Sequence, residues 1–170
     1  MRVLTPQILR QIKKEIRVLG VSVGLEGQSY IIIGIVFRGS LWLDGVLRRR
    51  SEDPDLTDDL IDMILSSPHA GQIRVIILSH ETLQAGAIID PNQLNIKTKK
   101  PVIFLEEPMI SSGSTFTWRN DGDIVKFSIF GLSRWAAEEV LKVSTRVGLI
   151  PEALKIATLT LSALLEGKQT

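Results

Sequence analysis

Asp44 is the acidic residue whose surroundings most clearly suggest a chemical role. It stands in the apolar run Trp42–Val46, where a carboxylate costs free energy unless it is paired or lies at an edge. One interpretation is a metal ligand or a general base. The other, which these residues alone favour, is a structural carboxylate bonded to Arg48 or to backbone amides. Asp90 precedes Pro91 and is better explained as a helix cap than as a catalytic group.

A second set of polar residues lies inside or directly after apolar segments. Ser22 falls inside one segment and Ser79 ends another, and His80, Glu81 and Thr82 follow it. Ligands of open α/β sheets gather at the carboxyl ends of strands, so these five are candidate binding residues. The alternative is a solvated loop histidine and serines bonded to nearby backbone. The chain contains no HExxH zinc motif and no GxxxxGK[ST] phosphate cradle, and neither serine is expected to be a hydrolase nucleophile.

Two basic runs are candidate contacts for a nucleic-acid backbone, because each phosphate contact by a cation adds salt-dependent affinity. Solvated loop charge is the commoner explanation of such runs. Aromatic residues make up only 5% of the chain, which offers little for a platform that stacks single-stranded bases. The two runs are Arg48, Arg49 and Arg50, and Lys97, Lys99 and Lys100.

Composition bounds the class of protein. The 170 residues are 44% hydrophobic and 23% charged, which predicts one globular domain over residues 1–170. Twenty Lys and Arg against 19 Asp and Glu give a formal charge of +1, which excludes a strongly basic nucleic-acid coat protein. Cysteine is absent, which excludes a thiol nucleophile, a Cys-ligated metal and a disulfide framework. A cytoplasmic location is the simplest expectation.

The N-terminal residues predict an amphipathic helix with Pro6 near its start, because Ile8, Ile12 and Ile16 recur at helical spacing. Packing on the protein's own sheet is favoured over a membrane or nucleic-acid surface. The longest apolar run elsewhere, residues 30–36, is far short of the roughly 20 residues of a membrane span. No membrane partner is therefore expected.

Hydrophobic patterning predicts alternating strands and helices. A helix with Leu56 and Leu60 on its apolar face follows three closely linked strands, and a stretch over 91–98, helical or loop, separates two later strands. A C-terminal hairpin then precedes two helices, the first capped by Ser133 with Trp135 on its inner side, the second started by Pro151. The predicted strands are 16–23, 30–37, 41–48, 73–79, 101–105, 114–119 and 124–130, and the helices are 56–66, 134–145 and 151–165.

This order of elements is that of the ribonuclease H-like α/β fold. That fold is a mixed five-stranded sheet, with three antiparallel strands joined to two parallel ones and helices on both faces. Here the hairpin and the last helices are additions to it. Pattern alone leaves other α/β folds open.

Four segments together resemble an archaeal family known as domain of unknown function 99, which is itself similar to endonuclease V. The resemblance spans residues 16 to about 165 and implies the ribonuclease H-like fold. The segments are Ile16–Val21, Phe37–Gly39 with Trp42–Leu47, Pro68–Ile76, and Ile150–Ala157.

The resemblance also implies a chemistry, in which acidic residues on neighbouring strands hold magnesium. The family pattern has two acids near the end of the first strand, where this chain has Gly20-Val21-Ser22-Val23-Gly24, and an acid where Ser79 stands. Asp44 alone stands where the pattern has an acid, with Asp90 a less central match. A serine hydroxyl is a weak neutral ligand, so the resemblance implies a degenerate metal site, unless Glu81, Glu106 or Glu107 substitutes from a loop.

Three functions follow as hypotheses. The favoured one is a nuclease-like protein without metal activity that binds nucleic acid or a protein partner. The second is an active magnesium-dependent endonuclease on DNA or RNA that uses Asp44 with loop carboxylates such as Glu81. The third is a structural role without nucleic acid. A free sheet edge or the N-terminal helix could support an oligomer.

Overall fold

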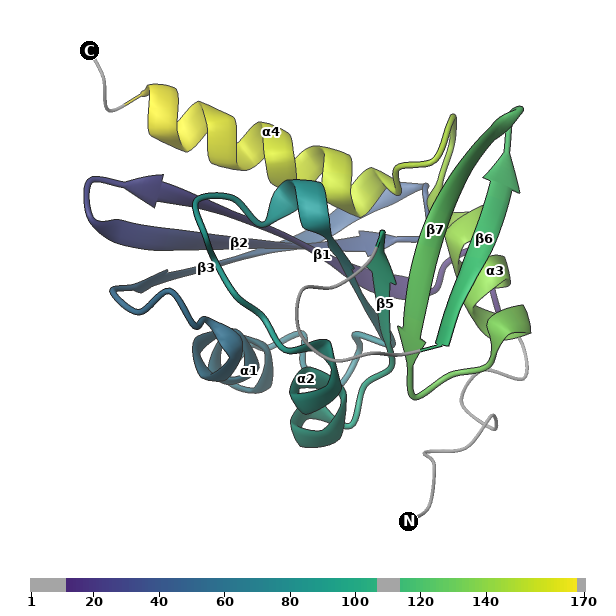
Figure 1. Ribbon diagram of the computed structural model, residues 1–170, viewed down its shortest axis with the longest axis horizontal. Helices are drawn as coiled ribbons and strands as arrows, with labels where there is room; N and C mark the ends of the chain where they lie inside the picture. The colour runs from purple at the N-terminus through teal and green to yellow at the C-terminus, as the bar shows by residue number, and fades with distance from the viewer. Residues whose placement is uncertain (1–11, 107–113, 168–170) are drawn as a thin grey trace.

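One mixed sheet of seven strands organises the chain (Figure 1). The computed structural model describes residues 12–106 and 114–167. The strand order across the sheet is β3-β2-β1-β4-β5-β7-β6. The strands are β1 (Arg17–Glu26), β2 (Ser29–Arg38), β3 (Trp42–Ser51), β4 (Val75–Ser79), β5 (Val102–Leu105), β6 (Ser114–Asn120) and β7 (Asp123–Phe130). The helices are α1 (Thr57–Leu65), the 3₁₀ turn η1 (His80–Thr82), α2 (Pro91–Thr98), α3 (Arg134–Ser144) and α4 (Glu152–Glu166).

The topology confirms the predicted mixed α/β sheet and corrects its size. Strands β1, β2 and β3 form an antiparallel meander, and β4 and β5 add to it in parallel. The C-terminal hairpin was expected as an addition, but β7 pairs antiparallel with β5 and extends the same sheet to seven strands. The pairing of β7 with β5 is consistent with the burial of Phe127, whose ring lies fully within the core.

Helix α4 crosses one face of the sheet and α1 and α2 cover the other, as Figure 1 shows. On the α4 face, two glycines of β1 let the helix come close. A Cβ added at Gly20 would lie 2.5 Å from the backbone carbon of Ala153, and one at Gly24 would lie 3.1 Å from Leu161. This face of β1 is therefore closed by direct helix-on-strand contact.

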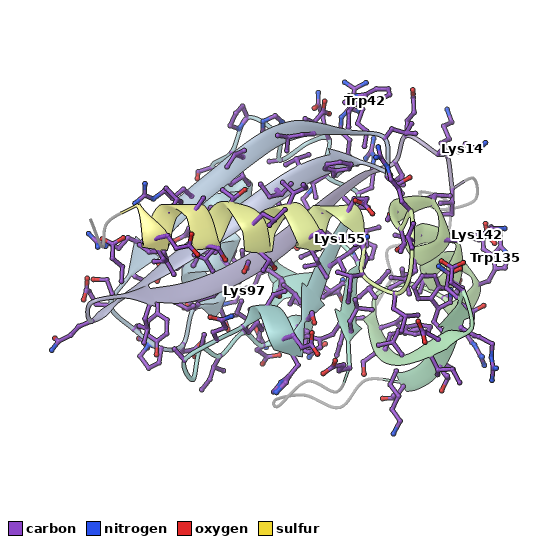
Figure 2. The ribbon with its side chains drawn as sticks, turned by 90° about the horizontal axis from the view of Figure 1, so that it is seen from above. Lys14, Trp42, Lys97, Trp135, Lys142 and Lys155 are labelled. Carbon is purple, nitrogen blue, oxygen red and sulfur yellow. The ribbon has the colours of Figure 1, made fainter. Side chains whose placement is uncertain are left out.

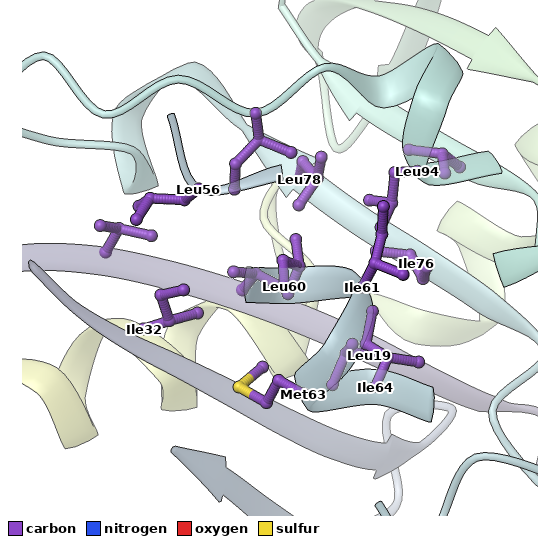
Figure 3. Packing of buried hydrophobic residues seen from close by; sticks show 14 of the residues in the cluster. Leu19, Ile32, Leu56, Leu60, Ile61, Met63, Ile64, Ile76, Leu78 and Leu94 are labelled. Atoms are coloured by element: carbon purple, nitrogen blue, oxygen red, sulfur yellow. The ribbon is translucent and has the colours of Figure 1, made fainter. Parts of the chain in front are cut away.

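The opposite face carries a core of aliphatic side chains (Figure 3). Leu60 and Ile64 of α1 lie against Leu19 of β1 and Ile76 of β4, and each of the four is fully buried. Because side chains alternate along a strand, the residues of β1 divide between the two cores. Leu19 and Val21 face α1, and Val18 faces α4.

Two further expectations meet corrections. Residues 12–16 lead into β1 through a turn rather than a helix, because Ile16 is buried in the core beside β1 instead of continuing a helical stripe. The rest of the predicted N-terminal helix, with Pro6 and Ile8, lies outside the described residues. Trp135 was expected on the inner side of α3 but is 56% exposed, since the neighbouring Ala136 and Ala137 take the buried positions.

Both predicted side-chain caps are confirmed. Ser133 accepts a hydrogen bond from the backbone N–H of Ala136, and Asp90 accepts from Asn92 and Gln93. Asp90 thus satisfies the start of α2, as its place before Pro91 predicted. In the ranges that the structure describes, no helix is long and apolar enough to cross a membrane.

Candidate functional site

Ser22, in the middle of β1, stands level with Ser79, the last residue of β4. The parallel ladder pairs Gly20 with Ile77, and the same register two residues further on places Ser22 beside Ser79. Ser22 alternates with Gly20 and Gly24, so it faces α4 as they do. The two serines are only 1% and 3% exposed. Two of the positions at which the resemblance implied acids therefore carry buried, neutral serines.

The spacing around Ser22 is that of a GxSxG motif, since the segment reads Gly20-Val21-Ser22-Val23-Gly24. In a nucleophile elbow that serine sits on a sharp strand-to-helix turn with its hydroxyl exposed. Ser22 instead lies inside a ten-residue strand and is buried. Ser22 therefore has the spacing of this motif but not the position of a nucleophile elbow.

The residues after Ser79 form the short turn η1, which the two hydroxyls of this segment stabilise. Ser79 accepts a hydrogen bond from the backbone N–H of Glu81 at 3.3 Å. The Thr82 hydroxyl donates to the carbonyl of Val21 at 2.8 Å and so ties η1 to β1. His80 and Glu81 are exposed on the outside of the turn. The structure thus brings the five predicted binding residues to one end of the sheet.

Asp44 lies in a different place, at a β-bulge near the start of β3. Its Oδ2 accepts a hydrogen bond from Nε of Arg17 at 2.6 Å and another from Nε of Arg38 at 2.8 Å. Arg17 and Arg38 are direct cross-strand neighbours in β1 and β2, where two like charges destabilise the pair. The carboxylate between them offsets that repulsion. The structural interpretation of Asp44 is supported, but Arg48 is not its partner.

The bulge explains why sequence spacing suggested the wrong partner. The register between β2 and β3 shifts between Val36 and Phe37, which pair with Gly45 and Leu43, so Asp44 is the extra residue. A bulge re-aims its side chain, and the carboxylate turns toward the start of β1. Asp44 is bonded to Arg17, which stands five residues before Ser22 in β1. At the usual rise per residue of a strand, Asp44 therefore lies roughly 15 Å from the hydroxyl pair of Ser22 and Ser79.

Hydrogen bonding sets the charge of Asp44. The hydrogen bond from Arg38 lowers the pKa of Asp44 below its usual value, partial burial opposes this, and the hydrogen bond from Arg17 lowers the pKa further. The pKa of Arg38 is raised, chiefly by the same hydrogen bond. Asp44 is therefore a carboxylate at neutral pH and remains one in mild acid.

Beside this ion pair lies a basic cleft of about 390 Å³. Four basic side chains and one carboxylate, that of Glu15, line this cleft. The net charge therefore stays positive even when the carboxylate of Asp44 is included. The residues of this basic cleft are Lys13, Glu15, Ile16, Arg17, Arg38, Gln72 and Arg74.

The turn between α1 and β4 places Gln72 and Arg74 at the basic cleft. The backbone N–H of Arg74 donates to the carbonyl of Arg17 at 2.9 Å. His69 packs so closely on Gly45 that a Cβ there would lie 2.4 Å from the imidazole Nε2. His69 is thus a packing residue that holds the turn against β3.

Lys100 braces the same turn from the other side. Its ammonium donates to the carbonyls of Ala70 and Ile73, the latter at 2.9 Å. Burial lowers the pKa of Lys100, and the nearby charge of Arg74 lowers it further. Lys100 was predicted as a nucleic-acid contact, but the structure directs its charge inward to backbone carbonyls.

The other predicted basic residues do not form a continuous patch, because acidic side chains lie among them. Arg49 pairs with Asp59 and Asp62 of α1, and Lys97 pairs with Asp58 of the same helix. Arg50 pairs with Glu26 at 2.7 Å. Arg48 and Lys99 are exposed. Surface pairs of this kind contribute little to stability, but they reduce the local positive potential.

These donor sets do not fit a magnesium ion. Within residues 12–106 and 114–167, no three His, Asp or Glu side chains gather as a metal site. The one carboxylate at the expected family position, Asp44, accepts from two guanidinium groups whose charges would repel a cation. Glu81 and Glu106 stand near the hydroxyl pair, at the ends of β4 and β5, and Glu107 lies outside the described residues.

The basic cleft escaped sequence reasoning because its residues come from separate segments. Arg17 and Arg38 each stand at one end of an apolar strand, as ordinary flanking charges do. The antiparallel register makes them neighbours. Three of the four segments that carry the family resemblance meet here, since they contain Arg17, Arg38 with Asp44, and Gln72 with Arg74. The presence of these residues in the family-like segments was the sequence signal that could have indicated the basic cleft.

The mixed sheet, with α4 on one face and α1 and α2 on the other, is an endonuclease V-like fold. Solved structures share this fold: human ENDOV matches with a TM-score of 0.71 over 98% of this chain and 92% of its own, at 14% identity. A protein of unknown function from Archaeoglobus fulgidus matches with a TM-score of 0.72 over 88% and 98%, at 24% identity. Ciona intestinalis endonuclease V, solved with a 24mer DNA containing an inosine, matches with 0.62 over 95% and 94%, at 11% identity.

Sequence comparison then shows the family. Residues 14–114 match the family described as Endonuclease dU, and the chain belongs to that family. A UPF0215 protein of Thermococcus kodakarensis is 30% identical over 95% of this chain and 98% of its own length. One of Pyrococcus furiosus is 27% identical over 96% and 99%. The resemblance inferred from the sequence is thus confirmed.

Proposed function

We propose that this protein acts as one ribonuclease H-like domain that binds nucleic acid through the basic cleft and has no metal-dependent nuclease activity. The observation that carries the proposal is the arrangement of Arg17 and Arg38 beside Arg74. A carboxylate already orients the first two, so their guanidinium groups are held in place before a ligand arrives. Pre-organised cations lose less entropy on binding an anion.

The guanidinium groups retain donors for a ligand. Each has five N–H groups, and Arg17 and Arg38 each direct Nε to Asp44. Elsewhere in the described parts of the chain we find no acceptor for their terminal nitrogens. The planar guanidinium group of arginine matches the oxygens of a phosphodiester. A nucleic acid carries one phosphate after another along its backbone, so it is the polyanion that suits several neighbouring arginines.

The proposal against cleavage rests on the residue types at the carboxyl ends of β1 and β4. Metal-assisted phosphodiester hydrolysis needs carboxylates that hold the ion beside the substrate. Ser22 and Ser79 are neutral and buried. The shared fold with an endonuclease V solved on DNA supports a nucleic-acid ligand without supplying the missing carboxylates.

The alternative, an active endonuclease built on Asp44 and Glu81, is less well supported. Asp44 binds two arginines at the start of β1, whereas Glu81 is exposed on η1 beyond the end of β4. Asp44 is already roughly 15 Å from Ser79, and Glu81 lies in the turn beyond Ser79, so one metal ion cannot bridge the two carboxylates.

Binding is tested by fluorescence anisotropy with end-labelled 20-mers of single-stranded DNA, duplex DNA and RNA across a range of salt. We expect Arg74→Ala to weaken binding and to reduce the slope of log Kd against log salt by about 1. Arg119→Ala is the matched control, because Arg119 is exposed on β6 at the far edge of the sheet. Equal losses in both variants would contradict a role for the basic cleft.

Cleavage is tested on the same labelled strands with millimolar Mg²⁺ or Mn²⁺. We expect intact strands with the wild-type protein. Metal-dependent products that disappear in Asp44→Asn would overturn the proposal and establish the alternative endonuclease.

A further inference from the structure

Trp42 is a large aromatic side chain left in solvent beside the basic cleft. It is 44% exposed, and its neighbours Leu41 and Leu43 are 39% and 48% exposed. Figure 2 shows Trp42 at the outer rim of the molecule. Trp42 pairs with Arg38 and Leu43 with Phe37, which are successive residues of β2, so Trp42 and Leu43 point to opposite faces of the sheet. Trp42 is the exposed ring on the face of Arg38.

Arg38 connects the indole to the basic cleft. Trp42 is the cross-strand partner of Arg38, and the guanidinium carbon of Arg38 lies 5.3 Å from the centroid of the Trp42 ring. The same guanidinium donates to Asp44 and lines the cleft. A phosphate bound by Arg38 therefore places the rest of its nucleotide next to the indole.

The turn that carries Trp42 is anchored to the body of the protein. Arg146 donates from Nε to the carbonyl of Ser40 at 2.6 Å and from Nη2 to that of Leu41 at 3.0 Å. The backbone N–H of Gly39 donates to the carbonyl of Ile16 at 2.7 Å. The indole thus stands on a fixed backbone, which lowers the entropy lost when a flat ligand stacks on it.

We infer that Trp42 stacks on one unpaired base of the nucleic acid whose phosphate the basic cleft holds, so that the ligand is single-stranded. This inference rests on the proposed function. In a duplex, both faces of an internal base are covered by its neighbours, whereas a single strand turns a base face outward. One exposed indole serves one base, which agrees with the low aromatic content of the chain.

The surroundings favour a base over an apolar protein surface as the occupant. Lys13 and three arginines line the adjoining cleft, and an apolar protein surface would leave these four charges without an anion. A nucleotide supplies both an anion for those cations and a flat ring for the indole.

The experiment compares three labelled 12-mers: single-stranded oligothymidine, a strand of the same length made only of abasic residues, and a duplex. Each is titrated against the wild-type protein, Trp42→Ala, Trp42→Phe and Trp135→Ala. Trp135 is the matched control, because it is a tryptophan that is 56% exposed on α3, outside the basic cleft. Circular dichroism melting curves confirm that each variant is folded.

We expect Trp42→Ala to weaken oligothymidine binding by about 5- to 100-fold, the range typical of losing one base–aromatic stack. Trp42→Phe retains a ring and recovers most of the affinity. The abasic strand binds the wild-type protein and Trp42→Ala equally, and Trp135→Ala matches the wild type throughout.

Two results overturn the inference, and they are distinguishable. The stacking inference is wrong if Trp42→Ala binds oligothymidine as tightly as the wild type does. It is also wrong if Trp42→Ala loses as much affinity for the duplex as for the single strand. In both cases phosphate binding by the basic cleft stands. If the wild-type protein binds none of the three probes in a salt-dependent manner, the proposed function fails and the inference fails with it.

Discussion

The two ends of strand β1 differ in charge, packing and exposure. Toward its carboxyl end, Ser22 stands level with Ser79, both residues are buried, and α4 covers that face. At its amino end, Arg17 and Arg38 hold Asp44 beside an open basic cleft. The end at which the family resemblance implies catalysis has a buried, uncharged face beneath α4, and the other end is open and charged.

This difference teaches that a shared fold does not fix where the charged side chains gather. A hydroxyl is small enough to be buried with a local hydrogen bond, whereas a carboxylate at the same place requires a metal, a partner or water. Once Ser22 and Ser79 occupy these positions, the helix can close over the sheet.

The largest expected effect comes from returning a carboxylate to the closed end. Ser22→Asp places a charge beneath α4 without a partner, and we expect it to lower the free energy of unfolding by about 3 kcal/mol at pH 7. Burial raises the pKa of such a carboxyl, so the loss shrinks as the pH falls toward 4. Urea denaturation measures both values.

Ser162→Asp is the control for that change, because Ser162 is exposed on α4. We expect it to alter stability by less than about 0.5 kcal/mol. If Ser22→Asp proves as stable as Ser162→Asp, the carboxyl end of β1 is open to solvent and the contrast between the two ends is lost.

A smaller effect tests how tightly α4 closes the sheet. A Cβ at Gly20 would lie 2.5 Å from the backbone of Ala153, so we expect Gly20→Ala to destabilise by about 2 kcal/mol through overpacking. Gly71→Ala is the matched variant, since a Cβ at Gly71 meets no atom within 4 Å. Thermal unfolding of both variants measures the difference, and equal midpoints would show that the helix moves aside freely.

The smallest effect concerns the open end. Asp44→Asn removes the carboxylate between Arg17 and Arg38, and we expect a loss of about 1 kcal/mol at pH 7, discounted for the partial exposure of the pair. Because the folded protein lowers the pKa of Asp44, the wild type keeps this contribution above pH 4. It loses the contribution as the pH falls through the lowered value.

Denaturation curves of the wild type and Asp44→Asn should therefore converge in acid. A difference that stays constant down to pH 2 would mean that the ionised carboxylate does not hold the two arginines.

Much of the fold could be predicted from the sequence. The apolar runs of β1 and β2 and the spacing of Leu56 and Leu60 follow local periodicity, which sets strands and helices. The joining of β7 to β5 could not be predicted, because strand pairing depends on contacts distant in sequence. The exposure of Trp135 escaped for a similar reason, since Ala136 and Val140 satisfied the buried face of α3 without it.

The site was predicted less well than the fold. The gathering of Ser22 with Ser79–Thr82 followed from strand order, because parallel strands end at the same edge. The partners of Asp44 depend on a bulge in β3, for which the neighbouring Gly45 was the one sequence signal, since a glycine inside a strand often marks a bulge. Its place in a basic run predicted Lys100 to be a surface cation, although two backbone carbonyls accept its hydrogen bonds.

The contact of Arg38 with the Trp42 ring has an optical consequence. Indole emission responds to a charge held near the ring, and this charge is one that a ligand in the cleft would touch. Trp118 is buried and Trp135 lies on α3, so both supply a background that the ligand leaves unchanged. A change in tryptophan fluorescence would therefore report a ligand in the basic cleft without an attached dye.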